Sequence, residues 1–155
     1  MSLLKIGDAA PGFTSINQNG ETVSWDSFRG KKVVLYFYPK DNTPGCTVEA
    51  KNMRDGKEEL LSRGFEIVGV SPDSVKSHEN FCNKYELNFT LLSDPDKTIA
   101  NAYGVWGEKQ FMGRTVTGIR RTTFVIDEKG VIERVFDKVD TKNHWQQILK
   151  SYGDK

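Results

Sequence analysis

The segment KVVLYFYPKDNTPGCTVEA, residues 32–50, decides the fold of this chain. Its first seven residues, Lys32 to Tyr38, form a near-continuous apolar run, which is typical of a central strand covered on both faces. Pro39 ends the run, and a loop of turn-forming residues follows it. From about Thr47 to Arg63 the sequence is rich in Glu, Lys and Leu, which predicts a helix that Gly64 ends.

Strands and helices alternate through the rest of the chain. Phe13 to Ser24 is predicted to be a β-hairpin, because Asn19-Gly20 supplies the positive φ angles of a tight turn. Further strands are expected at residues 65–70, 89–92, 122–127 and 131–136, and further helices at about 74–85, 99–103 and 142–152. The longest irregular stretch, Gly107 to Gly118, is a candidate border of a site. This order predicts one α/β domain over residues 1–155, with a central mixed sheet flanked by helices.

Composition and charge exclude several classes of protein. The 22 Lys and Arg residues nearly balance the 21 Asp and Glu residues, so the chain has no overall field to attract nucleic acid or an anionic membrane. No apolar run approaches the roughly 20 residues that a membrane span needs, and the first eight residues lack the apolar stretch of a signal peptide. Two cysteines are too few for a secreted disulfide scaffold. We therefore expect a cytoplasmic protein whose thiols are either core residues or reactive groups.

Cys46 lies where the predicted strand gives way to the predicted helix, an edge at which sites gather in open α/β sheets. The unpaired backbone N–H groups and the dipole of a first helical turn stabilise an anion there. An ordinary thiol is only a few per cent ionised at neutral pH, and such surroundings favour the thiolate. Pro44 and Gly45 disfavour helix just before Cys46, so we expect the thiol to be presented rather than buried. The alternative is a small buried core residue.

Pro39, Thr43 and Cys46 form the pattern Pro-x-x-x-Thr-x-x-Cys, which resembles the active-site motif of peroxiredoxins. Residues 36–50 resemble the bacterioferritin-comigratory or Q-type subfamily, and residues 88–94 and 118–127 extend the similarity over nearly the whole chain. The resemblance implies a thioredoxin-like fold and a thiol peroxidase that reduces hydrogen peroxide and organic hydroperoxides in antioxidant defence. It implies that Cys46 attacks the peroxide and that thioredoxin is the reductant. We expect no cofactor and no metal.

Two residues of the motif have candidate roles beside the thiol. Thr43 offers a hydroxyl that both donates and accepts hydrogen bonds, which suits the positioning of a peroxide. It is also a candidate helix cap, and this role does not exclude the first. The resemblance places Pro39 as a shield that shapes the loop.

A permanent cation is also needed, to favour the thiolate and to stabilise the departing oxygen. Arg120 and Arg121 are adjacent, so on a strand they face opposite sides and only one is expected to reach the site. Periodicity leaves that choice open, and the family pattern Arg-x-Ser/Thr-Phe selects Arg121. Glu49, one turn after Cys46, is a candidate to orient the guanidinium, or it is only a first-turn partner of the helix dipole.

Cys82 is the candidate resolving cysteine. Many members of the subfamily carry this residue five positions after the first cysteine, where this chain has Lys51. Other similar members carry it in the next helix, where Cys82 lies 36 residues after Cys46. Alternatively, Val75, Cys82 and Tyr85 share one helical face and Cys82 belongs to the core.

A disulfide between Cys46 and Cys82 requires movement of the backbone. The two Cα atoms of a disulfide lie within about 7 Å of each other, which two intact helices rarely allow. We therefore expect the start of the Cys46 helix and part of the Cys82 helix to unravel locally in each cycle. A disulfide within one chain removes one reason to dimerise, so we expect a monomer.

Three other interpretations compete for the same thiols. A dithiol oxidoreductase of the thioredoxin type requires Cys-x-x-Cys, which this sequence lacks. A metal site would combine His78, Cys82, Cys46 and His144, but their spacings lack the paired close ligands of zinc modules. We expect the two histidines to be surface residues that flank helices. A redox sensor would be oxidised once per thiol, without the repeated turnover of an enzyme.

Overall fold

The computed structural model describes residues 3–153. The main sheet has seven strands in the spatial order β2-β1-β5-β4-β3-β8-β9, namely β1 (Thr14–Asn17), β2 (Thr22–Ser24), β3 (Lys32–Phe37), β4 (Phe65–Ser71), β5 (Thr90–Ser93), β8 (Thr122–Ile126) and β9 (Ile132–Phe136). Two more strands form a separate hairpin, β6 (Trp106–Phe111) and β7 (Arg114–Ile119). The helices are η1 (Trp25–Phe28), α1 (Pro44–Ser62), α2 (Val75–Tyr85), α3 (Thr98–Tyr103) and α4 (His144–Lys150).

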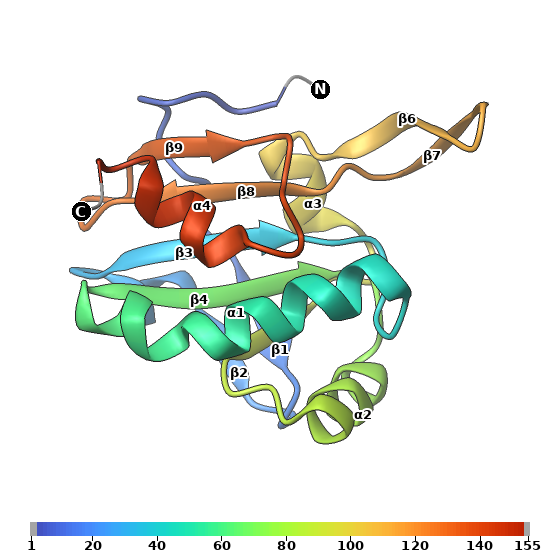
Figure 1. The fold of residues 1–155 in the computed structure, drawn as a ribbon, viewed down its shortest axis with the longest axis horizontal. Coiled ribbons are helices and arrows are strands. Elements are labelled where there is room, and N and C mark those ends of the chain that lie inside the picture. Colours follow the sequence, from blue (N-terminus) through green and yellow to red (C-terminus); the bar gives the residue numbers. More distant parts are fainter. Residues whose placement is uncertain (1–2, 154–155) are drawn as a thin grey trace.

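Strand β3 is the centre of the sheet and leads directly to Cys46. It pairs in parallel with β4 and antiparallel with β8, so the sheet is mixed. Val34 and Tyr36 face a core that includes residues of α1, α2 and α4, whereas Leu35 and Phe37 face a second core that includes residues of α3. Figure 1 shows α1 and α4 on one side of the sheet and α3 behind it. The prediction of a central strand covered on both faces is confirmed.

Helix α1 is held on the sheet along its middle by α4. A Cβ built on Gly56 would lie 2.2 Å from Cγ of Trp145, so only glycine allows the indole ring to approach the helix this closely. The side chain of Asn52 adds three hydrogen bonds, because it accepts from the backbone N–H of Trp145 at 2.9 Å and donates to the carbonyl of Lys142 at 2.9 Å and to Gln146 Oε1 at 3.1 Å. These contacts attach the central part of α1 to the C-terminal helix.

Most expected elements are present, and the fold is α/β as predicted. The hairpin of β1 and β2 and the pairing of β8 with β9 are both confirmed. The expectation of irregular structure over Gly107 to Gly118 is wrong, because β6 and β7 form a hairpin there. Met112 and Gly113 make its turn with φ angles of 53° and 79°. The hairpin projects away from the main sheet (Figure 1), so its residues lack the alternating apolar pattern by which a half-buried strand is recognised.

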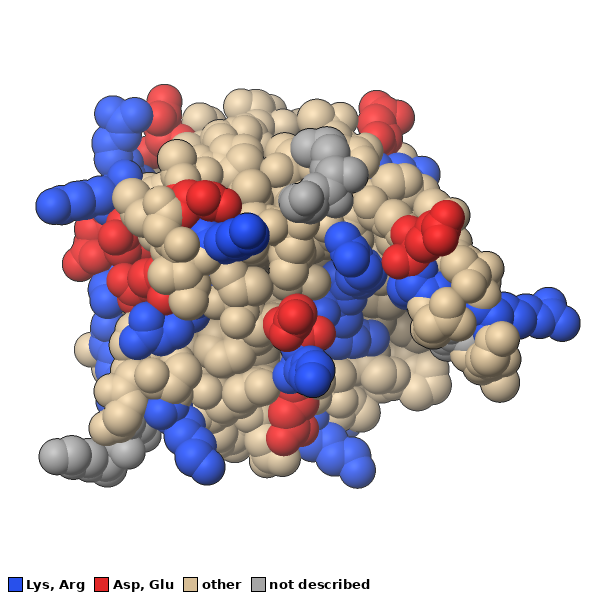
Figure 2. All heavy atoms as spheres, turned by 90° about the horizontal axis from the view of Figure 1, so that it is seen from above, with Lys and Arg blue, Asp and Glu red and all other residues tan. Residues whose placement is uncertain are grey.

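The surface carries charges of both signs. On the face shown in Figure 2, Lys and Arg side chains lie interspersed with Asp and Glu side chains rather than gathered in a patch of one sign. Among residues 3–153, no helix has both the length and the apolar character to cross a membrane.

Candidate active site

Cys46 is the third residue of α1, and its thiol is buried. The helix begins at Pro44, and Thr43 is the residue before it in extended conformation. Cys46 therefore lies in the first turn, as expected, but it is only 1% exposed and belongs to the core between α1 and the sheet. The expectation of a presented thiol is wrong, because a proline at the first helical position begins a helix instead of interrupting it. The sulfur is thus turned inward, toward the strands.

Arg121 lies beside this sulfur. Its Nη2 donates to Cys46 Sγ at 3.3 Å, and its Nη1 donates to Glu49 Oε1 at 2.6 Å. The neighbouring Arg120 points elsewhere and donates to the carbonyl of Gly104 at 2.6 Å. A Cβ on Gly45 would lie 3.3 Å from Nη2 of Arg121, so the absence of a side chain there leaves room for the guanidinium. The geometry places a guanidinium donor beside a sulfur atom in the first turn of a helix, two features that stabilise negative charge as it develops there.

Glu49 holds the other side of the guanidinium. Its side chain is fully buried, Oε1 accepts from Arg121, and Oε2 has no hydrogen-bond partner among the described residues. Burial raises the pKa of Glu49 to about 7, although the charge and the hydrogen bond of Arg121 oppose the rise. Burial also disfavours the charged guanidinium, but Glu49 and Cys46 together raise the pKa of Arg121 above its ordinary value. The guanidinium therefore stays charged, whereas Glu49 titrates near neutral pH.

His144 lies behind Glu49 as a neutral, buried ring. Burial lowers its pKa to about 4. Its Nδ1 faces Gln147 Oε1 at 2.9 Å, an atom that can only accept, so Nδ1 carries the proton. Nε2 then accepts from the hydroxyl of Thr123 at 2.7 Å and has no proton to give Glu49 Oε2, 4.0 Å away. The buried carboxylate thus keeps one strong partner, Arg121.

Both histidines were expected at the surface, and both expectations are wrong, because His78 and His144 have 0% exposure. Their burial is possible because each ring nitrogen has a partner from another part of the chain or from the same helix. The four-ligand metal set of Cys46, Cys82, His78 and His144 does not come together in residues 3–153. The cluster with metal-ligand spacing in that range consists of Asp41, Asp73 and His78, which already hydrogen-bond one another or the backbone.

Thr43 and Pro39 border the loop before Cys46. The hydroxyl of Thr43 donates to the carbonyl of Lys40 at 2.9 Å and makes no hydrogen bond to the helix start. Thr43 is therefore not a side-chain cap in this structure, and its hydroxyl oxygen can still accept a hydrogen bond. Pro39 lies two residues after the end of β3 and is partly exposed.

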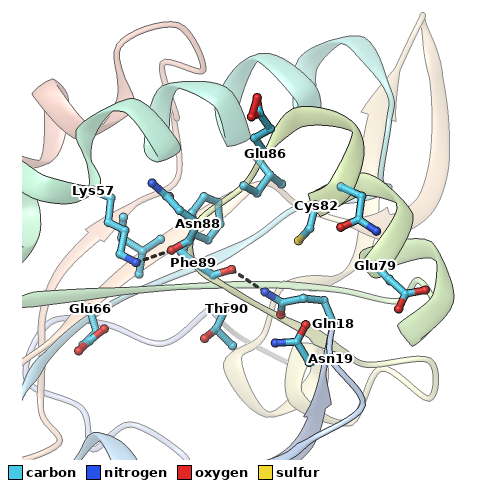
Figure 3. Close-up of a pocket in the computed structure, with 13 residues that line it drawn as sticks. Gln18, Asn19, Lys57, Glu66, Glu79, Cys82, Glu86, Asn88, Phe89 and Thr90 are labelled. Carbon is cyan, nitrogen blue, oxygen red and sulfur yellow. Dashed lines mark hydrogen bonds between the residues drawn. The ribbon is translucent and has the colours of Figure 1, made fainter.

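Cys82 lies in α2 with a buried, free thiol. It is 8% exposed, and burial, followed by the charge of Asp41, raises the pKa of its thiol to about 12. The sulfur points into a polar cavity of about 610 Å³ (Figure 3), whose lining includes Gln18, Lys57, Glu79, Cys82 and Phe89. In this folded state Cys82 is a poor nucleophile, because nearly all of it is protonated at neutral pH.

The β6–β7 hairpin contributes a second cation that the sequence did not reveal. Lys109 Nζ donates to the carbonyl of Ile119 at 2.8 Å. Burial and then the charge of Arg121 lower the pKa of Lys109, while Cys46 acts in the opposite direction. The hairpin therefore lies close enough to the site for the charges of Arg121 and Cys46 to act on Lys109, in line with the expectation that this stretch borders a site. A lysine in a polar hairpin carries no pattern that marks it out in advance.

The titration of Glu49 predicts a pH dependence of the reaction at Cys46. As the pH falls through about 7, Glu49 takes up a proton and Arg121 loses its ionic partner. The wild-type rate constant with peroxide should therefore fall toward acid pH. In Glu49→Gln the position is neutral at every pH, so that inflection should disappear and the rate at pH 8 should be about tenfold lower. Stopped-flow measurement from pH 5 to 8 checks this.

The free energy of unfolding of the wild type should change with pH in the opposite direction to its rate constant with peroxide. The carboxyl has a higher pKa in the folded state than in the unfolded state, so the protonated form contributes stability that is lost as the pH rises through about 7. Between pH 5 and pH 8, the free energy of unfolding of the wild type should therefore fall by about 3 kcal/mol relative to that of Glu49→Gln. Parallel curves for the two proteins, in rate and in stability, would contradict the assignment.

Known proteins share both this sequence and this fold. Residues 6–135 match the model of the AhpC/TSA family. The chain is 54% identical over 149 residues to a putative peroxiredoxin bcp of Haemophilus influenzae and 48% identical over 149 residues to peroxiredoxin Bcp of Escherichia coli, with 96% of each chain covered in both cases. A structure of peroxiredoxin Q from Xanthomonas campestris has a TM-score of 0.86 and 36% identity, covering 98% of this chain and 96% of its own. A PrxQ variant from Xylella fastidiosa has a TM-score of 0.90 and 31% identity, covering 99% and 98%.

Proposed function

The chain belongs to the AhpC/TSA family, as a thioredoxin-fold thiol peroxidase of the peroxiredoxin Bcp or Q type, and we propose that Cys46 is its peroxidatic nucleophile. The observation that carries the proposal is the 3.3 Å contact between Arg121 Nη2 and Cys46 Sγ at the start of α1. Neither a structural cysteine nor a solvated arginine accounts for a partly buried guanidinium held between a buried thiol and a buried carboxylate.

The first step is the attack of the Cys46 thiolate on the nearer peroxide oxygen. A sulfur–oxygen bond forms and the O–O bond breaks, so Cys46 becomes a sulfenic acid and the far oxygen leaves as hydroxide or alkoxide, which takes a proton to give water or an alcohol. Arg121 stabilises the charge that moves from sulfur to the leaving oxygen. Glu49 orients Arg121, the Thr43 hydroxyl binds the peroxide, and Pro39 shields the sulfur from bulk water.

The second step is the attack of Cys82 on the sulfenic sulfur. A Cys46–Cys82 disulfide forms, the sulfur–oxygen bond breaks, and the oxygen leaves as water with the proton of Cys82. The thiol of folded α2, with its pKa of about 12, is unsuited to this attack. Opening of α2 hydrates the sulfur and returns it toward the ordinary thiol value of about 8.5. Local unfolding therefore both moves Cys82 and activates it.

Thioredoxin is the proposed reductant. Its dithiol exchanges with the Cys46–Cys82 disulfide, so that both cysteines regain their thiols and thioredoxin leaves oxidised. Peroxiredoxins act on peroxides, and we assign hydrogen peroxide and organic hydroperoxides as substrates of this chain. We further propose that it acts as a single-domain monomer in the cytoplasm, where reducing conditions keep the two free thiols available.

Mass spectrometry after one equivalent of peroxide tests the resolving role. The intact chain should lose two hydrogens, and its digest should contain one peptide pair joined through Cys46 and Cys82. Cys82→Ser should instead gain one oxygen on Cys46, which a sulfenic-acid reagent traps. A wild-type protein that yields only the oxygen adduct, or a disulfide between two chains, would rule out Cys82 as the partner within the chain.

A further inference from the structure

The loop before Cys46 is attached to the helix that carries Cys82. Asp41, five residues before Cys46, is buried, and its Oδ2 accepts from the hydroxyl of Ser77 at 2.7 Å and lies 2.7 Å from Nδ1 of His78. Both partners belong to α2, one turn before Cys82. The hydrogen bonds of this one carboxylate thus join the two cysteine-bearing segments.

Asp41 and His78 form a buried hydrogen-bonded pair. The fully buried ring donates from Nε2 to the carbonyl of Leu92 at 3.0 Å, and that oxygen can only accept. The carboxylate of Asp41 faces Nδ1 and also accepts from the hydroxyls of Tyr38 at 2.6 Å and Ser77. The carboxyl group of Asp41 and both ring nitrogens of His78 thus all have hydrogen-bond partners, so this polar contact is satisfied although it is buried.

Asp41 itself is fixed to the sheet. Its backbone N–H donates to Asp73 Oδ2 at 2.7 Å, just after β4, and Tyr38 follows β3. On the α2 side, the attachment is made by two consecutive residues, Ser77 and His78. We therefore expect Asp41 to stay in place on the sheet when this contact breaks, and α2 to move away from it.

A second, exposed contact lies on the other side of Cys82. The side-chain oxygen of Asn42 accepts from the hydroxyl of Tyr85 at 3.0 Å and from Lys84 Nζ at 3.3 Å. Cys82 therefore lies between two attachments of α2 to the same two-residue stretch. The buried contact is the more costly one to break, because separating its partners inside the protein would leave polar groups without hydrogen bonds.

We propose that Asp41 and His78 are positioning residues for the resolution step, and that their buried hydrogen-bonded contact sets how often α2 opens to release Cys82. This proposal rests on the proposed function, in which Cys82 attacks the Cys46 sulfenic acid with loss of water. The observed rate of disulfide formation is then the open fraction of α2 multiplied by the rate of attack in the open state. A weaker contact between Asp41 and His78 raises the open fraction and speeds resolution, while the chemistry at Cys46 is left as it was.

His78→Gln tests this directly, because the shorter amide has similar polarity but cannot reproduce the two opposed contacts of the ring, with Asp41 and with the carbonyl of Leu92. Stopped-flow fluorescence should show disulfide formation about tenfold faster, with sulfenic-acid formation changed less than about twofold. Over-oxidation of Cys46 at high peroxide should fall by a similar factor, because the sulfenic acid survives for a shorter time. The amides of residues 75–85 should exchange hydrogen faster in the reduced variant.

Two further variants make the outcome decisive. Lys76→Ala removes the exposed pair of Lys76 and Glu79 from the same helix, and it should change neither rate. Ser77→Ala removes one neutral hydrogen bond to Asp41 and should speed disulfide formation about threefold. It replaces His78→Gln as the test if that variant fails to fold.

The possible failures are distinguishable. A wild-type protein that forms no Cys46–Cys82 bond refutes the proposed function. A bond that forms in the wild type, but no faster in Ser77→Ala and His78→Gln, overturns the positioning role alone. Equal changes in both rate constants would show that His78 and Ser77 only support the fold.

Discussion

Cys46→Ser is expected to consume no hydroperoxide above background, whichever thiol is supplied. A serine hydroxyl is essentially un-ionised at neutral pH, so the contact with Arg121 that stabilises a thiolate has no anion to act on. The expected loss of kcat/KM is at least about 10⁴-fold. Peroxide consumption is measured with thioredoxin and its reductase, and separately with a small thiol.

Cys82→Ser is the matched control, because it makes the same change of sulfur to oxygen in the other buried thiol. It should fail mainly with thioredoxin and keep turning over with the small thiol, which can attack the sulfenic acid directly. Activity in Cys46→Ser, or equal loss for both variants with the small thiol, would remove Cys46 from its role. A wild type that is oxidised once and never turns over would be a sensor and not an enzyme.

Arg121→Gln should lower the second-order rate constant with hydroperoxide by about 10²- to 10³-fold. The variant loses a fixed donor at 3.3 Å from the sulfur, where charge moves during O–O cleavage. It also leaves the buried carboxylate of Glu49 without its partner at 2.6 Å. Arg121→Lys should restore only part of the rate, because one ammonium group cannot donate in a rigid fork to the sulfur and the carboxylate together.

Arg120→Gln provides the control in the neighbouring residue. It removes the same charge, but its guanidinium donates to the carbonyl of Gly104 and not to the thiol. We expect its rate constant to stay within about threefold of the wild type, whatever it loses in stability. Losses of equal size in Arg120→Gln and Arg121→Gln would mean that net charge or packing, and not position beside the sulfur, explains the effect.

The central part of the fold could be predicted because its signals are local. The apolar run of β3 and the helix-forming residues of α1 each follow from neighbouring residues, and the pairing of β3 with β4 confirms the buried strand. The burial of His78 and His144 could not be predicted in this way. It depends on partners such as Asp41 and Thr123, which lie 37 and 21 residues away in sequence.

The features of the site also differ in whether they follow from neighbouring residues or from distant ones. The position of Cys46 in a first turn follows from its loop and helix, whereas the inward turn of its side chain depends on whether Pro44 begins the helix or precedes it. Strand periodicity does not choose between the two adjacent arginines, and the resemblance to peroxiredoxins selected Arg121. No sequence pattern marked Lys109 as a site residue, because its position near Arg121 and Cys46 depends on how β6 and β7 pair in a polar hairpin.

The contact of Trp145 with Gly56 limits how far α1 can open. The indole and the three hydrogen bonds of the Asn52 side chain anchor the helix from its third turn onward, so unwinding that begins at Pro44 is stopped within six residues after Cys46. Helix α4 thus limits how many residues of α1 can unwind, and therefore how far the Cys46 sulfur can move. We therefore expect only the first residues of α1 to unwind in a catalytic cycle while the rest of the helix stays in place, so that Cys82 makes the larger movement.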